Sequence, residues 1–397
     1  MNKCFALLSL SLFLFPAWAN DDHHGTPFPR DATFSTLILT PFPFGIEGLT
    51  GDHAGNLYTT GRLAGAPCPV WRISVAAPDL LPVGSVPAPC SPSGIAFNAH
   101  GDLFLSDADK VWTLTPNAVS PPIATVYATG VPGTNGLAFD RSGNLWTGDG
   151  TTGQGRVWKI APGGVVTEVF RVQPLANEVN LAAGVGGVGR DVRSLPPGAI
   201  TVTPTTRNAQ NLLGSQPLVA NGVAFDRDGD LYIADTARGA IWKVEFDRHG
   251  NLRSRVGCDT TFTPNTLCLD NILVTHPLLE GADGIALDAA GNIWVAANER
   301  NAIVAVTPRG RVTEIFRNPP NAAGLRNSAD PAVGDNHILE TPTSPFLLGH
   351  KFCTANSDGN RRDNFPNTGG EVKPTGPVAK ISCMDQRLRI PGLRLPL

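Results

Sequence analysis

The chain has 397 residues, of which 42% are hydrophobic and 16% are charged, so it has enough apolar material for a packed core and is not a disordered chain. Its 31 Lys and Arg nearly balance its 34 Asp and Glu, and the formal net charge of −3 argues against a nucleic-acid partner. The 43 glycines and 35 prolines disfavour long helices, so the composition indicates a turn-rich, all-β protein.

The first 19 residues have the features of a secretory signal peptide. Lys3 supplies a positive charge, an apolar run follows at 4–16, and residues 17–19 (Ala-Trp-Ala) form a small-x-small cleavage pattern. A membrane anchor is the less favoured alternative, because the run is shorter than the ~20 residues of a spanning helix. We therefore predict a signal peptide at 1–19, a flexible mature N-terminus at 20–31, no membrane association after cleavage, and a secreted or periplasmic protein.

A twelve-residue repeat organises the rest of the chain. A typical copy begins with a polar residue and a glycine, which a short apolar stretch follows. A Gly-Asn or Gly-Asp pair comes next, and the copy ends with an aliphatic and an aromatic residue. Five copies align without a gap and a sixth is degenerate: Glu47–Tyr58, Ser93–Phe104, Asn135–Trp146, Asn221–Tyr232, Asp283–Trp294 and Ser344–Ala355. Because such glycine pairs supply the positive φ angles of tight hairpins, each copy predicts a strand, a turn and a second strand.

Further strands follow each copy of the repeat. A third apolar strand comes next, and a fourth is predicted after some copies, for example at 165–170 and 311–316. Four strands per unit, repeated radially, predict a six-bladed β-propeller with four-stranded antiparallel blades and a central tunnel. We expect one domain over residues 32–397, in which residues 32–40 supply the outer strand that closes the ring. The Gly/Pro-rich segment at about 173–217 lacks the repeat and is predicted to be an insertion loop.

Cysteine usage agrees with export. Cleavage of the signal peptide would leave six cysteines, and an even number in an exported chain favours disulfides. Six cysteines allow fifteen pairings. Proximity in the sequence favours Cys68–Cys90, Cys258–Cys268 and Cys353–Cys383.

The first residue of the repeat carries the candidate chemistry. Because a given repeat position has the same height and radius in every blade, six oxygen-bearing side chains are expected at one end of the tunnel: Glu47, Ser93, Asn135, Asn221, Asp283 and Ser344. Carboxylate and carboxamide oxygens suit Ca²⁺ or another divalent cation. We therefore predict that Ser93 and Ser344 support the other four residues, which are the metal ligands. Asn-Gly and Asp-Gly are also common turn dipeptides, but the turn lies further along each repeat.

Three copies of the repeat resemble a known family. The segments at 135–140, 221–226 and 282–288 are similar to the senescence marker protein/gluconolactonase/luciferin-regenerating enzyme family, which is related to diisopropyl fluorophosphatase and paraoxonase. The resemblance covers roughly residues 40–385 and implies a six-bladed propeller with Ca²⁺ in its tunnel. It implies that the metal ligands are Glu47, Asn135, Asn221 and Asp283 and that the last of these is also catalytic.

These features lead to two main functional hypotheses. The first is an exported Ca²⁺-dependent hydrolase of a small-molecule lactone or related ester, in which the metal polarises the carbonyl and Asp283 is the general base or the nucleophile. The second is a non-catalytic propeller, a binding or scaffold module with a structural tunnel ion, because one fold hosts many functions. A lyase or condensing enzyme is a third alternative, but such enzymes typically use a tunnel histidine or glutamate as the base, and His53 and His100 fall in predicted turns.

Overall fold

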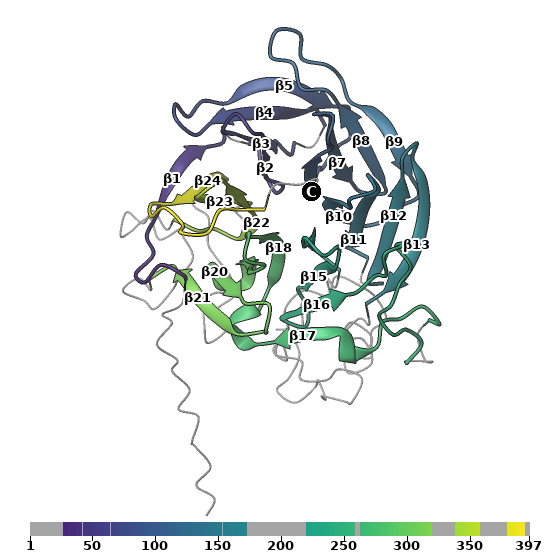
Figure 1. Ribbon diagram of the computed structural model, residues 1–397. Coiled ribbons are helices and arrows are strands. Elements are labelled where there is room, and N and C mark those ends of the chain that lie inside the picture. The colour runs from purple at the N-terminus through teal and green to yellow at the C-terminus, as the bar shows by residue number, and fades with distance from the viewer. Residues whose placement is uncertain are drawn as a thin grey trace, which may run out of the picture.

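The computed structural model describes residues 27–41, 43–63, 65–152, 154–172, 220–258, 263–319, 338–357 and 379–393. These residues form six four-stranded antiparallel sheets that stand radially around a central axis (Figure 1). The predicted all-β, six-bladed propeller is thus confirmed. The signal peptide expected at 1–19 and the insertion expected at about 173–217 lie outside the described residues. Within the described ranges, no helix has the length and apolar character needed to cross a membrane.

Each blade runs from an inner strand at the axis to an outer strand at the rim. Blade 1 comprises β2 (Thr50–Gly51), β3 (Asn56–Thr60), β4 (Cys68–Ser74) and β5 (Leu81–Val86), and blade 2 comprises β6 (Ile95–Phe97), β7 (Leu103–Asp107), β8 (Lys110–Leu114) and β9 (Thr125–Thr129). Blade 3 comprises β10 (Thr134–Phe139), β11 (Leu145–Asp149), β12 (Arg156–Ala161) and β13 (Val165–Arg171), and blade 4 comprises β14 (Val223–Phe225), β15 (Leu231–Asp235), β16 (Ala240–Val244) and β17 (Ile272–Thr275). Blade 5 comprises β18 (Ala282–Leu287), β19 (Ile293–Ala297), β20 (Ala302–Val306) and β21 (Val312–Arg317), and blade 6 comprises β22 (Pro342–Leu348), β23 (Lys351–Asn356), β24 (Lys380–Met384) and β1 (Phe34–Leu39). Short 3-10 turns lie at η2 (Leu269–Asn271), η3 (Pro277–Leu279) and η4 (Asn298–Arg300).

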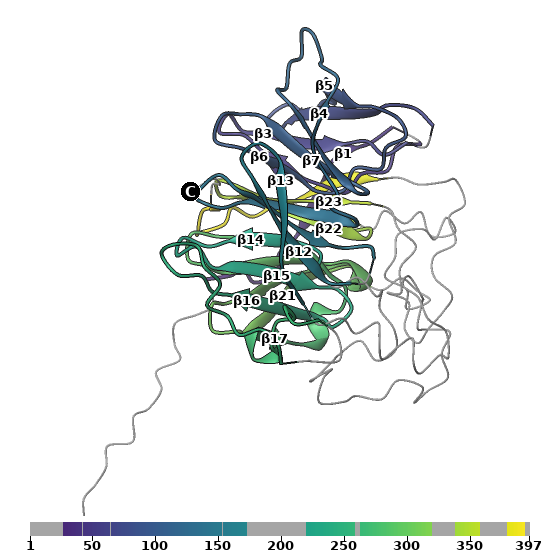
Figure 2. The same cartoon turned by 90° about the vertical axis from the view of Figure 1, so that its right-hand side faces the viewer.

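The N-terminal strand closes the ring, as the sequence predicts. Strand β1 pairs antiparallel with β24, with Phe34 opposite Met384, and so completes blade 6 from the far end of the chain. Blade 6 in turn packs against blade 1, because its inner strand β22 contacts β2. Figure 2 shows the blades edge-on, stacked around the axis. Closure leaves the inner strands of all six blades facing one central tunnel.

The hairpin between the first two strands of a blade is held by an aspartate. In blade 3, Asp140 Oδ1 accepts from the backbone N–H groups of Ser142 and Asn144 at 2.9 Å, and Oδ2 accepts from Trp146 Nε1 at 2.9 Å. Asp52, Asp226 and Asp288 make the same kind of turn in their own blades. The aspartate therefore caps the turn and also fixes the aromatic residue of the repeat.

Blade 2 differs, because asparagine takes the capping position and the aspartate follows the glycine of the turn. Asn98 Oδ1 accepts from the backbone N–H groups of His100 and Asp102 at 2.9 Å. Hydrogen bonds from Thr115 and Asn98 then hold the pKa of the Asp102 carboxyl below its ordinary value of 3.8.

Apolar side chains fill the space between neighbouring blades. The aromatic residues of the repeat lie there: Trp146 of blade 3 meets Phe225 of blade 4 with ring centroids 5.7 Å apart, and Tyr58 of blade 1 meets Phe97 of blade 2 at 4.9 Å. All three predicted disulfides are present: Cys68–Cys90, Cys258–Cys268 and Cys353–Cys383.

Candidate functional site

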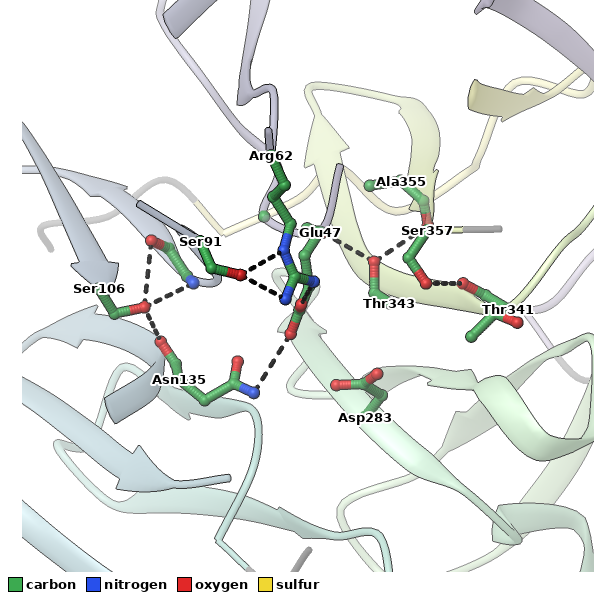
Figure 3. A network of polar contacts seen from close by, with 12 residues as sticks. Glu47, Arg62, Ser91, Ser106, Asn135, Asp283, Thr341, Thr343, Ala355 and Ser357 are labelled. Carbon is green, nitrogen blue, oxygen red and sulfur yellow. Dashed lines mark hydrogen bonds and ion pairs between the residues drawn. The ribbon is translucent and has the colours of Figure 1, made fainter. Parts of the chain in front are cut away.

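The predicted column of oxygen-bearing residues lies where the inner strands begin. In blade 5 the pairing of β18 with β19 passes from Ala282 opposite Ala297 to Ile285 opposite Val295, so Asp283 and Gly284 oppose a single residue. The same bulge holds Asn135 in blade 3. A bulge re-aims the side chain that it carries. Figure 3 shows the side chains of Glu47, Asn135 and Asp283 turned toward one another across the tunnel.

The glycine that follows each column residue is required by the approach of the next blade. A Cβ added at Gly222 would lie 2.5 Å from the Asp283 carbonyl oxygen, and one added at Gly136 would lie 2.7 Å from that of Asn221. Neither residue has a positive φ. The recurring Asn-Gly and Asp-Gly pairs are therefore a packing requirement of the tunnel wall, and the tight turns are made by other residues.

The register of blade 6 differs by one residue from the sequence alignment. The pairing of β22 with β23 passes from Pro342 opposite Asn356 to Ser344 opposite Ala355, so the residue in the bulge is Thr343. A Cβ at Gly284 would meet the Thr343 carbonyl oxygen at 2.3 Å, just as one at Gly222 would meet that of Asp283. Thr343 therefore completes the column, and Ser344 takes the position that glycine holds in the other blades. The shorter hairpin of blade 6 hides this shift in the sequence.

Contacts within the column link different blades directly. Asn135 Nδ2 donates to Glu47 Oε1 at 3.2 Å, although the two residues are 88 positions apart. Thr343 Oγ1 donates to the Glu47 backbone carbonyl at 2.7 Å. Asn221 and Asp283 are 2% and 5% exposed, so both are almost fully withdrawn from bulk water. Ser93 is also buried, and its backbone N–H donates to the Ser106 carbonyl.

A second column, which the sequence analysis did not identify, lies fifteen residues after the first. Asn298 Nδ2 donates to Asp283 Oδ2 at 2.8 Å, and Asn221 Nδ2 donates to Thr236 Oγ1 at 3.1 Å. In blade 1 the corresponding residue is Arg62, which forms an ion pair with Glu47. The spacing is constant because this residue follows the second strand of the blade, directly beside the start of the first. That constant offset is the signal by which the sequence could have revealed the column.

Glycine fills the second column in blade 3. A Cβ at Gly150 would lie 2.5 Å from Asn135 Nδ2, so any side chain there would displace the amide. Because Gly150 has no side chain to offer, Asn135 turns to Glu47 of another blade instead. Gly150 thus allows the two predicted ligands to meet.

The donor set fits a hard divalent cation. It consists of two carboxylates and two carboxamides at the starts of the inner strands, and Ca²⁺ prefers such oxygen ligands. Among the described residues, no cluster of three or more His, Cys, Asp or Glu could hold a metal ion. The column does not form such a cluster, because half of its candidate ligands are asparagines. Glu47, Asn135, Asn221 and Asp283 are the side chains that would hold the ion.

A cavity of about 620 Å³ lies at the opposite end of the tunnel, and polar hairpin residues such as Asp52 and His100 line it together with apolar residues of the inner strands. Its wall contains the residues two positions beyond the column, among them Leu49, Leu137 and Ile285. The C-terminal segment runs past this end, where Gly392 N donates to the Gly349 carbonyl and Leu393 N to that of Leu287. The column residues do not line this cavity. The candidate chemistry therefore lies at the end of the tunnel away from this cavity.

Part of the chain matches the model of a known protein family. Residues 180–324 match the family model described as the SMP-30/Gluconolactonase/LRE-like region. The predicted family resemblance is confirmed. Asn221 and Asp283 both lie within the matched residues. A search of curated proteins finds no match. The family match supports a propeller of the lactonase type.

Solved structures share the fold of this propeller. A luciferin-regenerating enzyme superposes with a TM-score of 0.55 at 14% identity, over 91% of this chain and 97% of that one. The calcium-binding protein regucalcin from Agrobacterium tumefaciens gives a TM-score of 0.54 at 17% identity, over 92% and 97%. A predicted gluconolactonase gives a TM-score of 0.53 at 15% identity, over 92% and 96%. At these identities the likeness shows the common architecture alone.

Proposed function

We propose that this protein is an exported, Ca²⁺-dependent hydrolase of a lactone or related ester, with Glu47, Asn135, Asn221 and Asp283 as the metal ligands. The observation that carries the proposal is the meeting of Glu47, Asn135 and Asp283 at one end of the tunnel, in a chain with the SMP-30/Gluconolactonase/LRE-like match. The three disulfides support export, because disulfides persist in oxidising compartments. Another divalent cation could serve in place of Ca²⁺.

The reaction assigns one role to the ion and another to Asp283. When bound, the cation would polarise the substrate carbonyl as a Lewis acid and stabilise the oxyanion. The Asp283 carboxylate would take a proton from the attacking water and pass it to the leaving alkoxide as the acyl C–O bond breaks, or would itself attack the carbonyl carbon and form an acyl-enzyme that water then hydrolyses. Asn298 Nδ2, at 2.8 Å from Asp283 Oδ2, holds the carboxylate in a fixed orientation. Burial of Asp283 limits competing water around it.

Replacement of Asp283 tests the proposal. We expect Asp283→Asn to lower the turnover of aryl esters and lactones by about 10²–10⁴-fold, the usual share of a general base, while thermal unfolding shows a folded propeller. Asp247→Asn is the matched control, because Asp247 is a partly exposed turn residue of blade 4. Full activity of Asp283→Asn would refute the assignment.

A calorimetric Ca²⁺ titration of chelator-treated protein separates the proposal from its alternative. We expect about one ion per chain in the wild type and no binding in Asp283→Ala. Tight binding without hydrolysis of any lactone, aryl ester or phosphotriester would favour the non-catalytic propeller with a structural ion. Absence of binding in the wild type would refute the metal site itself.

A further inference from the structure

Arg62 stands out in the second column because it is charged. The corresponding residues in blades 2 to 5, at the same offset of fifteen from the column, are Ala108, Gly150, Thr236 and Asn298. In blades 4 and 5 a short neutral side chain is enough to hold the column residue. Packing of the propeller therefore does not require a cation at this position.

The guanidinium of Arg62 is held in place from two sides. Nε and Nη2 donate to Ser91 Oγ at 3.1 and 2.8 Å, and Nη1 donates to Glu47 Oε2 (Figure 3). Ser91 is fixed in turn, because its backbone N–H donates to Asp107 Oδ1 at 2.9 Å. Of the five N–H groups of a guanidinium, these bonds use three. One N–H on each Nη makes no hydrogen bond to a described residue, and the side chain is 34% exposed at the tunnel.

The net charge of the column residues and Arg62 would change from negative to positive when a divalent cation binds. Glu47 and Asp283 carry two negative charges, and Arg62 offsets one of them. A divalent ion on the predicted ligands would leave these groups with a net charge of +1. It would also draw on the same Glu47 carboxylate that holds Nη1. A guanidinium keeps its charge at physiological pH, so Arg62 cannot remove this positive charge by losing a proton. An anion bound beside Arg62 would neutralise it.

We infer that Arg62 and the bound metal together form a site for a carboxylate of the substrate, so that the preferred substrate is an ester or lactone that carries a second, anionic carboxyl group. The inference rests on the proposed function for the reaction itself. The planar fork of arginine matches a carboxylate, and Ser91 orients that fork before the substrate arrives. Arg62 is a specificity-determining residue in this scheme, and the reacting carbonyl lies at the metal and Asp283.

Anion binding tests the inference without turnover. Glutarate is titrated calorimetrically into Ca²⁺-saturated protein, and we expect Arg62→Met to bind it at least tenfold more weakly than the wild type. Arg171→Met is the matched control, because Arg171 is also paired with a carboxylate, that of Glu168, but lies on the outer strand of blade 3. The Ca²⁺ affinity of Arg62→Met should be at least that of the wild type, since a competing cation is gone. Equal glutarate affinities in Arg62→Met and the wild type would overturn the inference.

Substrate preference gives a second readout. At saturating Ca²⁺, we expect the ratio of kcat/KM for mono-4-nitrophenyl glutarate over its uncharged methyl ester to fall at least tenfold in Arg62→Met. Ser91→Ala should lower the same ratio less, because it removes only the orienting contact. An unchanged ratio in Arg62→Met would refute the inference while leaving the proposed hydrolase intact. Arg62-dependent glutarate binding in a protein that hydrolyses neither ester would support the carboxylate site at Arg62 and would refute the assignment of such esters as substrates.

Discussion

Gly222→Ala tests whether the tunnel wall is as tightly packed as the structure indicates. The added Cβ would lie 2.5 Å from the Asp283 carbonyl oxygen, 2.7 Å from Gly284 Cα and 2.8 Å from Ile285 N, where ordinary contact begins at 3.4 Å. All three atoms belong to the main chain of blade 5. No side-chain rotation can relieve the clash, so the inner strands of blades 4 and 5 must move apart by almost 1 Å.

The expected cost follows from two contributions. Overpacking of a tight interior costs about 1–3 kcal/mol. Separation of the strands also stretches the hydrogen bond from Gly222 N to the Asp283 carbonyl, which is 3.1 Å long, and a lost bond of this kind costs about 1 kcal/mol. We therefore expect Gly222→Ala to lower the free energy of unfolding by about 2–4 kcal/mol. Because Asn221 and Asp283 flank the clash, Ca²⁺ affinity should fall as well.

Urea denaturation with two control variants isolates the clash. Gly45→Ala should leave stability within about 1 kcal/mol of the wild type, because a Cβ there meets no atom within 4 Å and φ is not positive. Gly229→Ala should cost about 1–2 kcal/mol through its φ of +90° alone. If Gly222→Ala is no less stable than Gly45→Ala, the argument from close approach of the blades is wrong.

Three further predictions concern the scaffold. Asp140→Ala should lower the free energy of unfolding by about 2 kcal/mol in urea denaturation, since a buried indole N–H loses its acceptor, and by more than the partly exposed cap variant Asp247→Ala. Asp102→Asn should flatten the acid limb of stability against pH: because folding lowers the pKa of this carboxyl, its contribution is complete above pH 3.8 and is lost as the pH falls through the folded value. Thermal unfolding that is equally acid-sensitive in the variant would contradict this. Replacing Cys353 and Cys383 together by alanine should cost about 3–4 kcal/mol, for a loop of 30 residues, and unchanged stability would show that the bond does not constrain the unfolded chain.

The sequence by itself determined the fold. A repeat is visible because each blade must meet the same local demands, namely a hairpin glycine, an aspartate cap such as Asp140 and an aromatic residue such as Trp146. The outer strand at 32–40 was predictable from its alternation, and the disulfides from their short separations of 22, 10 and 30 residues. Each of these features is recorded in a short stretch of chain, so no distant contact is needed to recognise it.

The sequence determined the candidate column only in part. Equal repeat positions lie at equal heights, so Glu47, Asn135 and Asp283 could be expected to meet, and the structure brings them together. The sixth position could not be fixed in this way. Its hairpin is shorter, so the alignment is off by one residue there. Only the pairing of β22 with β23 shows that Thr343 is the column residue and that Ser344 stands where the other blades have glycine.

Tertiary structure alone decided what surrounds the column. The contact between Asn135 and Glu47 joins residues 88 positions apart, and it exists because Gly150 leaves space for the amide to turn. The position of the Arg62 side chain depends on Ser91 of a different blade, which holds the guanidinium beside the Glu47 carboxylate. A repeat records what every blade shares, whereas these contacts arise where the blades differ. They depend on closure of the ring, which places unlike residues side by side around one axis.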